Sequence, residues 1–231
     1  MYIAKLKIKL FKMIKKIALF AFILVSALDL IGIIFKIEGL LYVFKPFVML
    51  ALLFLYTRSV SETNKWYSTA LIFSFFGDVF LMYSGQLPFK IGLISFLIAH
   101  ILFIKIVMHR IKKVSFLSIL TAIIPFGIFL SLLIFTLKDT LGELLVPVLI
   151  YGFTISIFGV VSLIHYLETK SNKSIWMLIG AIVFMISDAL LAINKFYLPK
   201  EIFDIFIMGT YIIAQYLIYR SMVLDTEKSS H

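Results

Sequence analysis

Eight apolar runs, each close to twenty residues long and separated by short polar linkers, account for almost all of this chain. A helix needs about 20 apolar residues to cross the hydrocarbon core of a bilayer, where its backbone must satisfy its own hydrogen bonds. We therefore predict an all-α membrane protein, a single bundle of about eight transmembrane helices. The predicted helices span residues 17–35, 40–57, 67–84, 89–109, 114–136, 143–165, 174–194 and 202–221.

The composition supports the same class. Hydrophobic residues make up 62 % of the chain and charged residues 15 %, and no soluble domain needs that much apolar surface. Because the linkers are short, nothing is left over for a soluble domain. We predict one polytopic domain over 1–231, with a basic N-terminal segment at 1–16, the bundle at 17–221 and a short tail at 222–231. The sequence has no cysteine, which excludes disulfides and thiolate metal sites.

The distribution of basic residues predicts the orientation. Of the 22 Lys and Arg residues, fifteen lie in predicted loops on the side of the N-terminus and five in loops on the opposite side. The positive-inside rule then places both termini in the cytoplasm, and we expect a bacterial inner (cell) membrane. The length of the first run and its Asp29 favour an uncleaved helix over a signal peptide. The net charge of +10 reflects this topology and attraction to anionic lipids, rather than nucleic-acid binding.

Two aspartates, Asp78 and Asp188, lie deep inside apolar runs with no basic neighbour in sequence to neutralise them. A carboxylate at membrane depth is costly, so such residues are by default candidates for function. Each lies six residues before the predicted outer end of its helix, about 9 Å below that end at the rise of an α-helix. The two carboxyl groups therefore share one level of the predicted bundle.

Further polar residues lie in the same half of the predicted membrane or near its midplane. They are Asp29, Lys45, His100, Tyr151, Tyr211 and Gln215. A polar layer that runs through several helices predicts a cavity open to the non-cytoplasmic face, because scattered hydrogen bonds between helices would not need to share a depth.

Each candidate also has a purely structural interpretation. The two aspartates could cap a kink or form an ion pair with Lys45. Lys45 precedes Pro46, so its side chain could reach outward to the interface instead of holding a phosphate or carboxylate. His100 fits a hydrogen bond between helices better than a metal site, since no second His or Cys shares its level. Asp29 fits a helix-end acid as well as a site residue.

Six separated motifs follow one another along the chain from Lys45 to about Tyr219. They are Lys45 with Pro46, GDVFLM, FKIGLISFLIAH, Tyr151, GAIVFMISDALLAINKF and YIIAQYLIY. In this order and spacing they resemble the YhhN family, which includes the lysoplasmalogenases of animals and bacteria. The chain departs from the family at Phe103, where tyrosine is common, so a hydroxyl role at that position is in doubt.

The resemblance implies an integral membrane hydrolase of about eight helices. Its reaction would cleave the vinyl-ether bond of lysoplasmalogens to a fatty aldehyde and glycerophosphoethanolamine or glycerophosphocholine. The family's polar residues fall on Lys45, Asp78, His100, Tyr151, Asp188, Asn194, Tyr211 and Gln215. We expect a lysophospholipid from the bilayer as substrate, surrounding membrane lipids as partners, and no metal or cofactor.

The residues also suit this chemistry by themselves. Hydrolysis of a vinyl ether begins with protonation of the carbon β to oxygen, and water then adds to the oxocarbenium ion. Burial disfavours the ionised form of a carboxyl group, and a second carboxyl group nearby disfavours it further, so one aspartate can stay protonated while the other is ionised. We predict that Asp78 and Asp188 are the acid and base, without a choice between them. The other six polar residues, Lys45, His100, Tyr151, Asn194, Tyr211 and Gln215, are predicted to bind substrate, Lys45 through the phosphate.

Two other classes of function use similar residues. A small proton-coupled transporter also places acids at membrane depth, but it would need a proton gradient and alternating access. A lipid-binding membrane protein without catalytic activity would keep its function after loss of both aspartates.

Overall fold

A computed structural model of the chain describes residues 2–227, with side chains from residue 10 to residue 225. This part is helical throughout and has no strand, which confirms the predicted fold class. The predicted basic segment and tail lie partly outside the described residues. The helices are α1 (Tyr2–Phe35), α2 (Glu38–Thr57), α3 (Lys65–Leu81), α4 (Gln86–Arg110), α5 (Phe116–Leu137), α6 (Leu145–Thr169), α7 (Asn172–Phe196) and α8 (Glu201–Glu227), with a short 3-10 helix at Gly142–Leu144 before α6.

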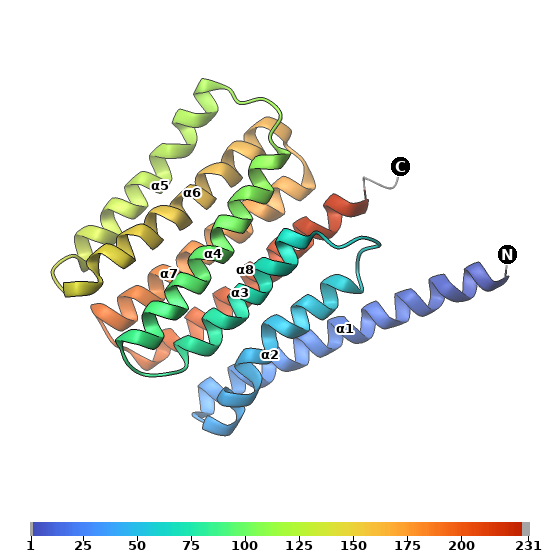
Figure 1. Cartoon of the computed structure of the whole chain (residues 1–231), viewed down its shortest axis with the longest axis horizontal. Helices are drawn as coiled ribbons and strands as arrows, with labels where there is room; N and C mark the ends of the chain where they lie inside the picture. The colour runs from blue at the N-terminus through green and yellow to red at the C-terminus, as the bar shows by residue number, and fades with distance from the viewer. Residues whose placement is uncertain (1, 228–231) are drawn as a thin grey trace.

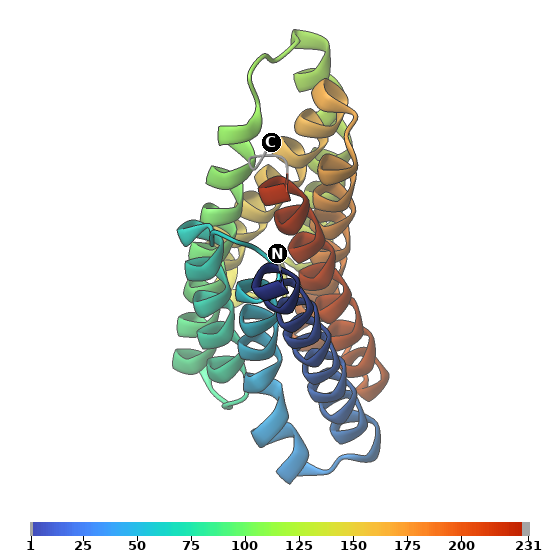
Figure 2. The same ribbon diagram turned by 90° about the vertical axis from the view of Figure 1, so that its right-hand side faces the viewer.

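The helices run up and down through a single elongated bundle (Figure 1). Contacts join α2 to α3, α3 to α4, α4 to α6, α6 to α7, α7 to α8 and α8 back to α2, so six helices form a closed ring. Helix α1 packs outside this ring on α2 and α8, and α5 packs outside it on α6 and α7. An even number of antiparallel helices leaves both ends of the described chain on one side, where they face the viewer in Figure 2.

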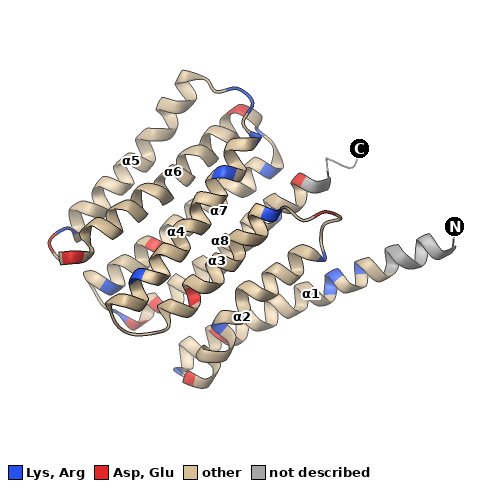
Figure 3. Ribbon diagram, viewed as in Figure 1, with Lys and Arg blue, Asp and Glu red and all other residues tan. Residues whose placement is uncertain are grey.

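Seven of the described helices are long and apolar enough to cross a membrane. Helix α3 is the exception, since its 17 residues reach only about 26 Å against a hydrocarbon core of about 30 Å. We predicted this helix to continue to residue 84, but it ends at Leu81, where the turn toward Gly85 begins. Gly85 has a φ of 116°, a left-handed conformation that glycine adopts without strain. Charged residues gather at helix ends and in loops, and the middles of the helices are mostly uncharged (Figure 3).

Local capping explains where several helices begin. The side chain of Asn64 accepts a hydrogen bond from the Tyr67 amide at the start of α3. At the start of α7, Ser171 and Ser174 form a reciprocal capping box, which satisfies amide groups that have no partner within the helix. The first helix is longer than predicted, because α1 continues as one helix from Tyr2 through the basic segment that precedes residue 17.

The contact between α7 and α8 depends on a glycine. A Cβ atom at Gly180 would lie 2.8 Å from Cγ1 of Ile218 and 3.2 Å from both the Ala214 carbonyl oxygen and the Ile218 amide nitrogen. A flexible side chain can move aside, but two of these atoms belong to the backbone. Gly180 therefore allows the close approach of the two helices that carry one side of the cavity described below.

We expect Gly180→Ala to be less stable than the matched variant Gly209→Ala by about 1–3 kcal/mol, the usual cost of overpacking a helix contact. A Cβ atom at Gly209 meets nothing within 4 Å, so that variant gains helix propensity without a clash. Thermal unfolding in detergent measures the difference. Equal melting temperatures would show that α8 moves freely away from α7.

Candidate functional site

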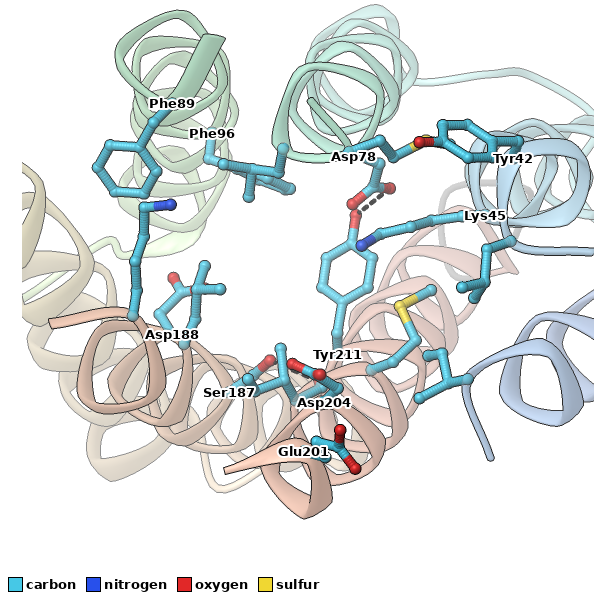
Figure 4. A pocket seen from close by; sticks show the side chains of 18 of the residues that line it. Tyr42, Lys45, Asp78, Phe89, Phe96, Ser187, Asp188, Glu201, Asp204 and Tyr211 are labelled. Carbon is cyan, nitrogen blue, oxygen red and sulfur yellow. Dashed lines mark hydrogen bonds between the residues drawn. The ribbon is translucent and has the colours of Figure 1, made fainter. Parts of the chain in front are cut away.

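A cavity of about 580 Å³ opens at the end of the bundle opposite the chain termini. It lies inside the ring, where α2, α3, α4, α7 and α8 converge, and the end of α1 borders it (Figure 4). The charged residues that line it are Lys36, Glu38, Lys45, Asp78, Asp188, Lys195, Glu201 and Asp204. This is the end that the distribution of basic residues predicts to be non-cytoplasmic.

The carboxyl group of Asp78 lies on α3, and two side-chain hydrogen bonds join α3 to α8 at this level. The Tyr211 hydroxyl donates a hydrogen bond to Oδ2 of Asp78 at 2.9 Å. One turn away on both helices, the Gln215 amide nitrogen donates to the Ser74 hydroxyl at 3.2 Å. Residues four apart lie on the same face of a helix. The two hydrogen bonds therefore join the same faces of α3 and α8, one helical turn apart. Gln215 therefore lies behind Tyr211 and does not line the cavity.

Helices α6 and α7 hold the second carboxyl group in the same way. The Tyr151 hydroxyl donates to Oδ2 of Asp188 at 2.5 Å. Neighbouring Ser187 donates to the Ile207 carbonyl oxygen at 2.8 Å, which ties α7 to α8 at this level. Asp188 is partly exposed to the cavity and Asp78 is buried at its wall. The two carboxyl groups face the same space from opposite sides (Figure 4).

Lys45 extends from α2 into the cavity between the two walls (Figure 4). Its ammonium group interacts electrostatically with Asp29, Asp78 and Asp204. None of the salt bridges among the described side chains includes it. Asp29 is fully buried in α1, and neither of its carboxyl oxygens has a hydrogen-bond partner. Lys45 therefore lines the cavity together with Asp78 and Asp204 but forms no direct salt bridge with either.

His100 lies outside the cavity, within the core behind Tyr151. Its Nδ1 atom donates to the Phe96 carbonyl oxygen at 2.8 Å, within the same helix. Its ring packs edge-on against Tyr151, with the centroids 5.5 Å apart, and against Phe184, at 4.6 Å. His100 therefore contacts the site from behind, through Tyr151, Phe184 and the Phe96 carbonyl group. Phe103, the departure from the family pattern, is also buried in this core.

Asn194 lies at the rim and organises the loop that joins α7 to α8. Its amide nitrogen donates to Oδ1 of Asp204 at 2.8 Å, and its oxygen accepts from the Lys200 amide at 2.7 Å. Asp204 lines the cavity, although the sequence did not point to it. The available signal was weak, because an acid in the first turn of a helix is an ordinary partner of the helix dipole.

A second, smaller crevice of about 40 Å³ adjoins the cavity. It lies between α4, α6 and α7, and Asp188 is the only charged residue among the described residues that line it. The two spaces share Leu81, Phe89, Phe96, Asp188 and Leu191. The walls of the crevice are otherwise apolar, apart from the Tyr151 hydroxyl.

The structure thus brings four of the eight predicted site residues to the large cavity, and they are Lys45, Asp78, Asp188 and Tyr211. Tyr151 lines the crevice. His100, Gln215 and Asn194 contact these residues or the cavity rim from behind. The described residues contain no group of three or more His, Cys, Asp or Glu side chains arranged to hold a metal ion.

Comparison with known proteins identifies the family of the chain. The sequence model of the YhhN family matches residues 40–222. The chain belongs to the YhhN family. The match begins within α2 and ends within α8, so it contains both cavity aspartates, both of their tyrosines and Lys45, and leaves out Asp29. Together with the apolar helices, membership of the YhhN family identifies a multi-pass integral membrane protein.

Two curated relatives are named lysoplasmalogenase TMEM86A. The human protein is 28 % identical over 173 residues, which cover 70 % of this chain and 66 % of the human protein. The bovine protein is 27 % identical over 169 residues, which cover 68 % of this chain and 65 % of the bovine protein. The chain thus spans about two thirds of the length of these relatives. No solved structure matches the chain.

Proposed function

We propose that this protein is a membrane-embedded hydrolase that cleaves the vinyl-ether bond of lysoplasmalogens. One observation carries the proposal: two carboxyl groups, each held by a tyrosine hydroxyl, face one cavity from opposite walls. The names of the curated relatives supply the substrate class. This reaction needs a proton donor and a carboxylate, and we assign these roles to the two carboxyl groups that line the cavity.

The proposed reaction proceeds in three steps. A protonated aspartate transfers its proton to the alkenyl carbon β to the ether oxygen. The π electrons of the double bond form the new C–H bond, and a lone pair of the ether oxygen stabilises the cationic neighbouring carbon as an oxocarbenium ion. Water adds to the cationic carbon and loses a proton to a carboxylate, which gives a hemiacetal. The hemiacetal collapses to a fatty aldehyde and releases the glycerol oxygen as an alcohol, so the water oxygen ends in the aldehyde.

The surroundings of the two aspartates suggest their roles. Asp78 faces the part of the cavity into which the Lys45 ammonium extends (Figure 4). Asp188 borders the apolar crevice, on the side where an alkenyl chain would lie, and its Oδ1 has no hydrogen-bond partner among the described residues. We therefore assign Asp188 as the acid, and Asp78 as the carboxylate that stabilises the cation and orients water.

Lys45 is proposed to hold the head-group phosphate as a point charge. We expect Lys45→Ala to raise KM by about 10-fold or more with a smaller change in kcat, since a phosphate contact acts alike in the ground and transition states. Lys45→Arg keeps the charge and should recover most of the affinity. Steady-state kinetics on both variants measure this split. A loss confined to kcat would instead place Lys45 in the proton-transfer chemistry.

The function is tested with detergent-purified protein and lysoplasmenylethanolamine. We expect equal amounts of fatty aldehyde and glycerophosphoethanolamine, because each turnover breaks one ether bond. The matching 1-acyl and saturated 1-alkyl lysolipids are the controls, since neither has a double bond to protonate. Release from the acyl lipid would identify an esterase. Absence of any product, with proton-dependent uptake into liposomes, would identify a transporter.

A further inference from the structure

Five of the eight charged residues that line the cavity come from the α1–α2 turn, α2 and α8. Lys36, Glu38 and Lys45 line it from the start of α2 and the turn before it, and Glu201 and Asp204 line it from the start of α8. The opposite side, formed by α4 and α7, presents Phe89, Phe96 and Leu191 to the cavity, together with Ser187, Asp188 and Lys195. Asp188 lies on this less charged side and also borders the crevice beyond it.

A lysoplasmalogen has the same division within one molecule. Its phosphate and glycerol are polar, its alkenyl chain is apolar, and the vinyl ether lies at the boundary. If the head group occupies the charged side, beside Lys45, the vinyl ether falls between Asp78 and Asp188. The first carbons of the chain then point past Asp188 toward the crevice.

We infer that the crevice between α4, α6 and α7 is the binding site for the alkenyl chain, and that Ala192 and Val148 determine which chains are accepted. This inference rests on the proposed function. Ala192 lies one turn beyond Asp188 on α7, and Val148 faces the same space from α6. Both are partly exposed, so a chain that passes between them continues to the lipid-facing surface of the bundle.

The crevice is narrow, which suits a chain and excludes a head group. Its volume of about 40 Å³ is close to the share of one water molecule in the liquid, about 30 Å³. Only the beginning of a chain fits unless the rings at one end move. Those rings are Phe89 and Phe196, which meet edge to face with centroids 5.4 Å apart. The Lys195 ammonium lies 4.7 Å from the centre of the Phe89 ring.

The other side of the cavity is a poor exit for a hydrocarbon chain. There the Lys36 ammonium and a Glu201 carboxyl oxygen form a salt bridge of 2.6 Å across the gap between the α1–α2 turn and α8. A chain that left by this route would pass Glu38, Asp204 and this ion pair. Desolvation of charged groups by a hydrocarbon is unfavourable, so the less charged side, formed by α4 and α7, offers the lower-energy path through the crevice.

The test compares two vinyl-ether lysolipids, one with a hexadecenyl chain and one with a butenyl chain that ends near Asp188. We expect Ala192→Phe to lower kcat/KM for the long chain relative to the short chain by at least about 10-fold, the effect of losing a methylene contact or more in an apolar pocket. Val148→Phe, on another helix, should shift the ratio in the same direction. The matched control is Ala27→Phe, on the exposed face of α1.

The outcomes separate the inference from the proposed function. An unchanged chain-length ratio in Val148→Phe and in a folded Ala192→Phe, with normal aldehyde release by wild type, overturns the chain site alone. An equal shift in Ala27→Phe also overturns it. Aldehyde release by wild type from neither substrate overturns the proposed function and the chain site with it.

Discussion

Asp188→Asn is expected to lower turnover by at least about 10²-fold, the usual effect of removing a general acid or base. The amide has the same shape and can still accept the hydrogen bond from Tyr151, but it has no acidic proton to give to the alkenyl carbon. KM should change little, because the phosphate contact with Lys45 remains. Single-turnover aldehyde release by detergent-purified protein measures the effect directly.

The matched control is Asp139→Asn, an exposed residue in the turn after α5. It removes one carboxyl group from the protein but none from the cavity, and its turnover should equal that of wild type. Thermal unfolding of both variants confirms that the loss is chemical. Turnover by Asp188→Asn within about threefold of wild type would contradict the assignment of Asp188 as the acid.

Asp78→Asn should also lose at least about 10²-fold in turnover, because a preorganised charge that stabilises the transition state contributes about that much or more. The amide oxygen can still accept the hydrogen bond from Tyr211. The amide has no negative charge, however, to offset the positive charge of Lys45 or of the oxocarbenium ion. Stopped-time aldehyde assays on this variant should show kcat falling with kcat/KM.

The two aspartates should also behave as a unit. The double variant Asp78→Asn, Asp188→Asn is expected to be about as slow as the slower single variant, since either loss disables the same step. Losses that multiply in the double variant would instead indicate two independent contributions, and the proposed division of roles between the carboxyl groups would then be wrong.

The sequence predicted the helices well because each apolar run had to cross one bilayer thickness. It also placed Asp78 and Asp188 at one depth, since depth follows from counting along a helix. The predicted positions of the helix ends were less accurate where a cap or a glycine turn determines the end, as at Leu81 of α3. The resemblance to the YhhN family was confirmed, because it depended on spaced motifs rather than on any one residue.

Contacts across helices could not be read from the sequence. Depth alone does not reveal that Tyr151 pairs with Asp188 and Tyr211 with Asp78, since rotation about each helix axis decides the partner. For the same reason the sequence could not separate residues that line the cavity from residues behind them, such as His100 and Gln215. The position of Asp204 at the cavity and the crevice beside Asp188 both depend on how the six helices close into a ring. Only the structure reveals this closure.

The most direct test of the account is the reaction of wild type with a lysoplasmalogen in D₂O, with the aldehyde trapped at once as a hydrazone. Protonation of the β carbon by an exchangeable aspartate predicts one deuterium per aldehyde, on the carbon next to the carbonyl. The double variant corrects for spontaneous hydrolysis. Aldehyde from wild type without deuterium at that carbon would contradict the account, because the bond would then break without proton transfer to the alkenyl chain.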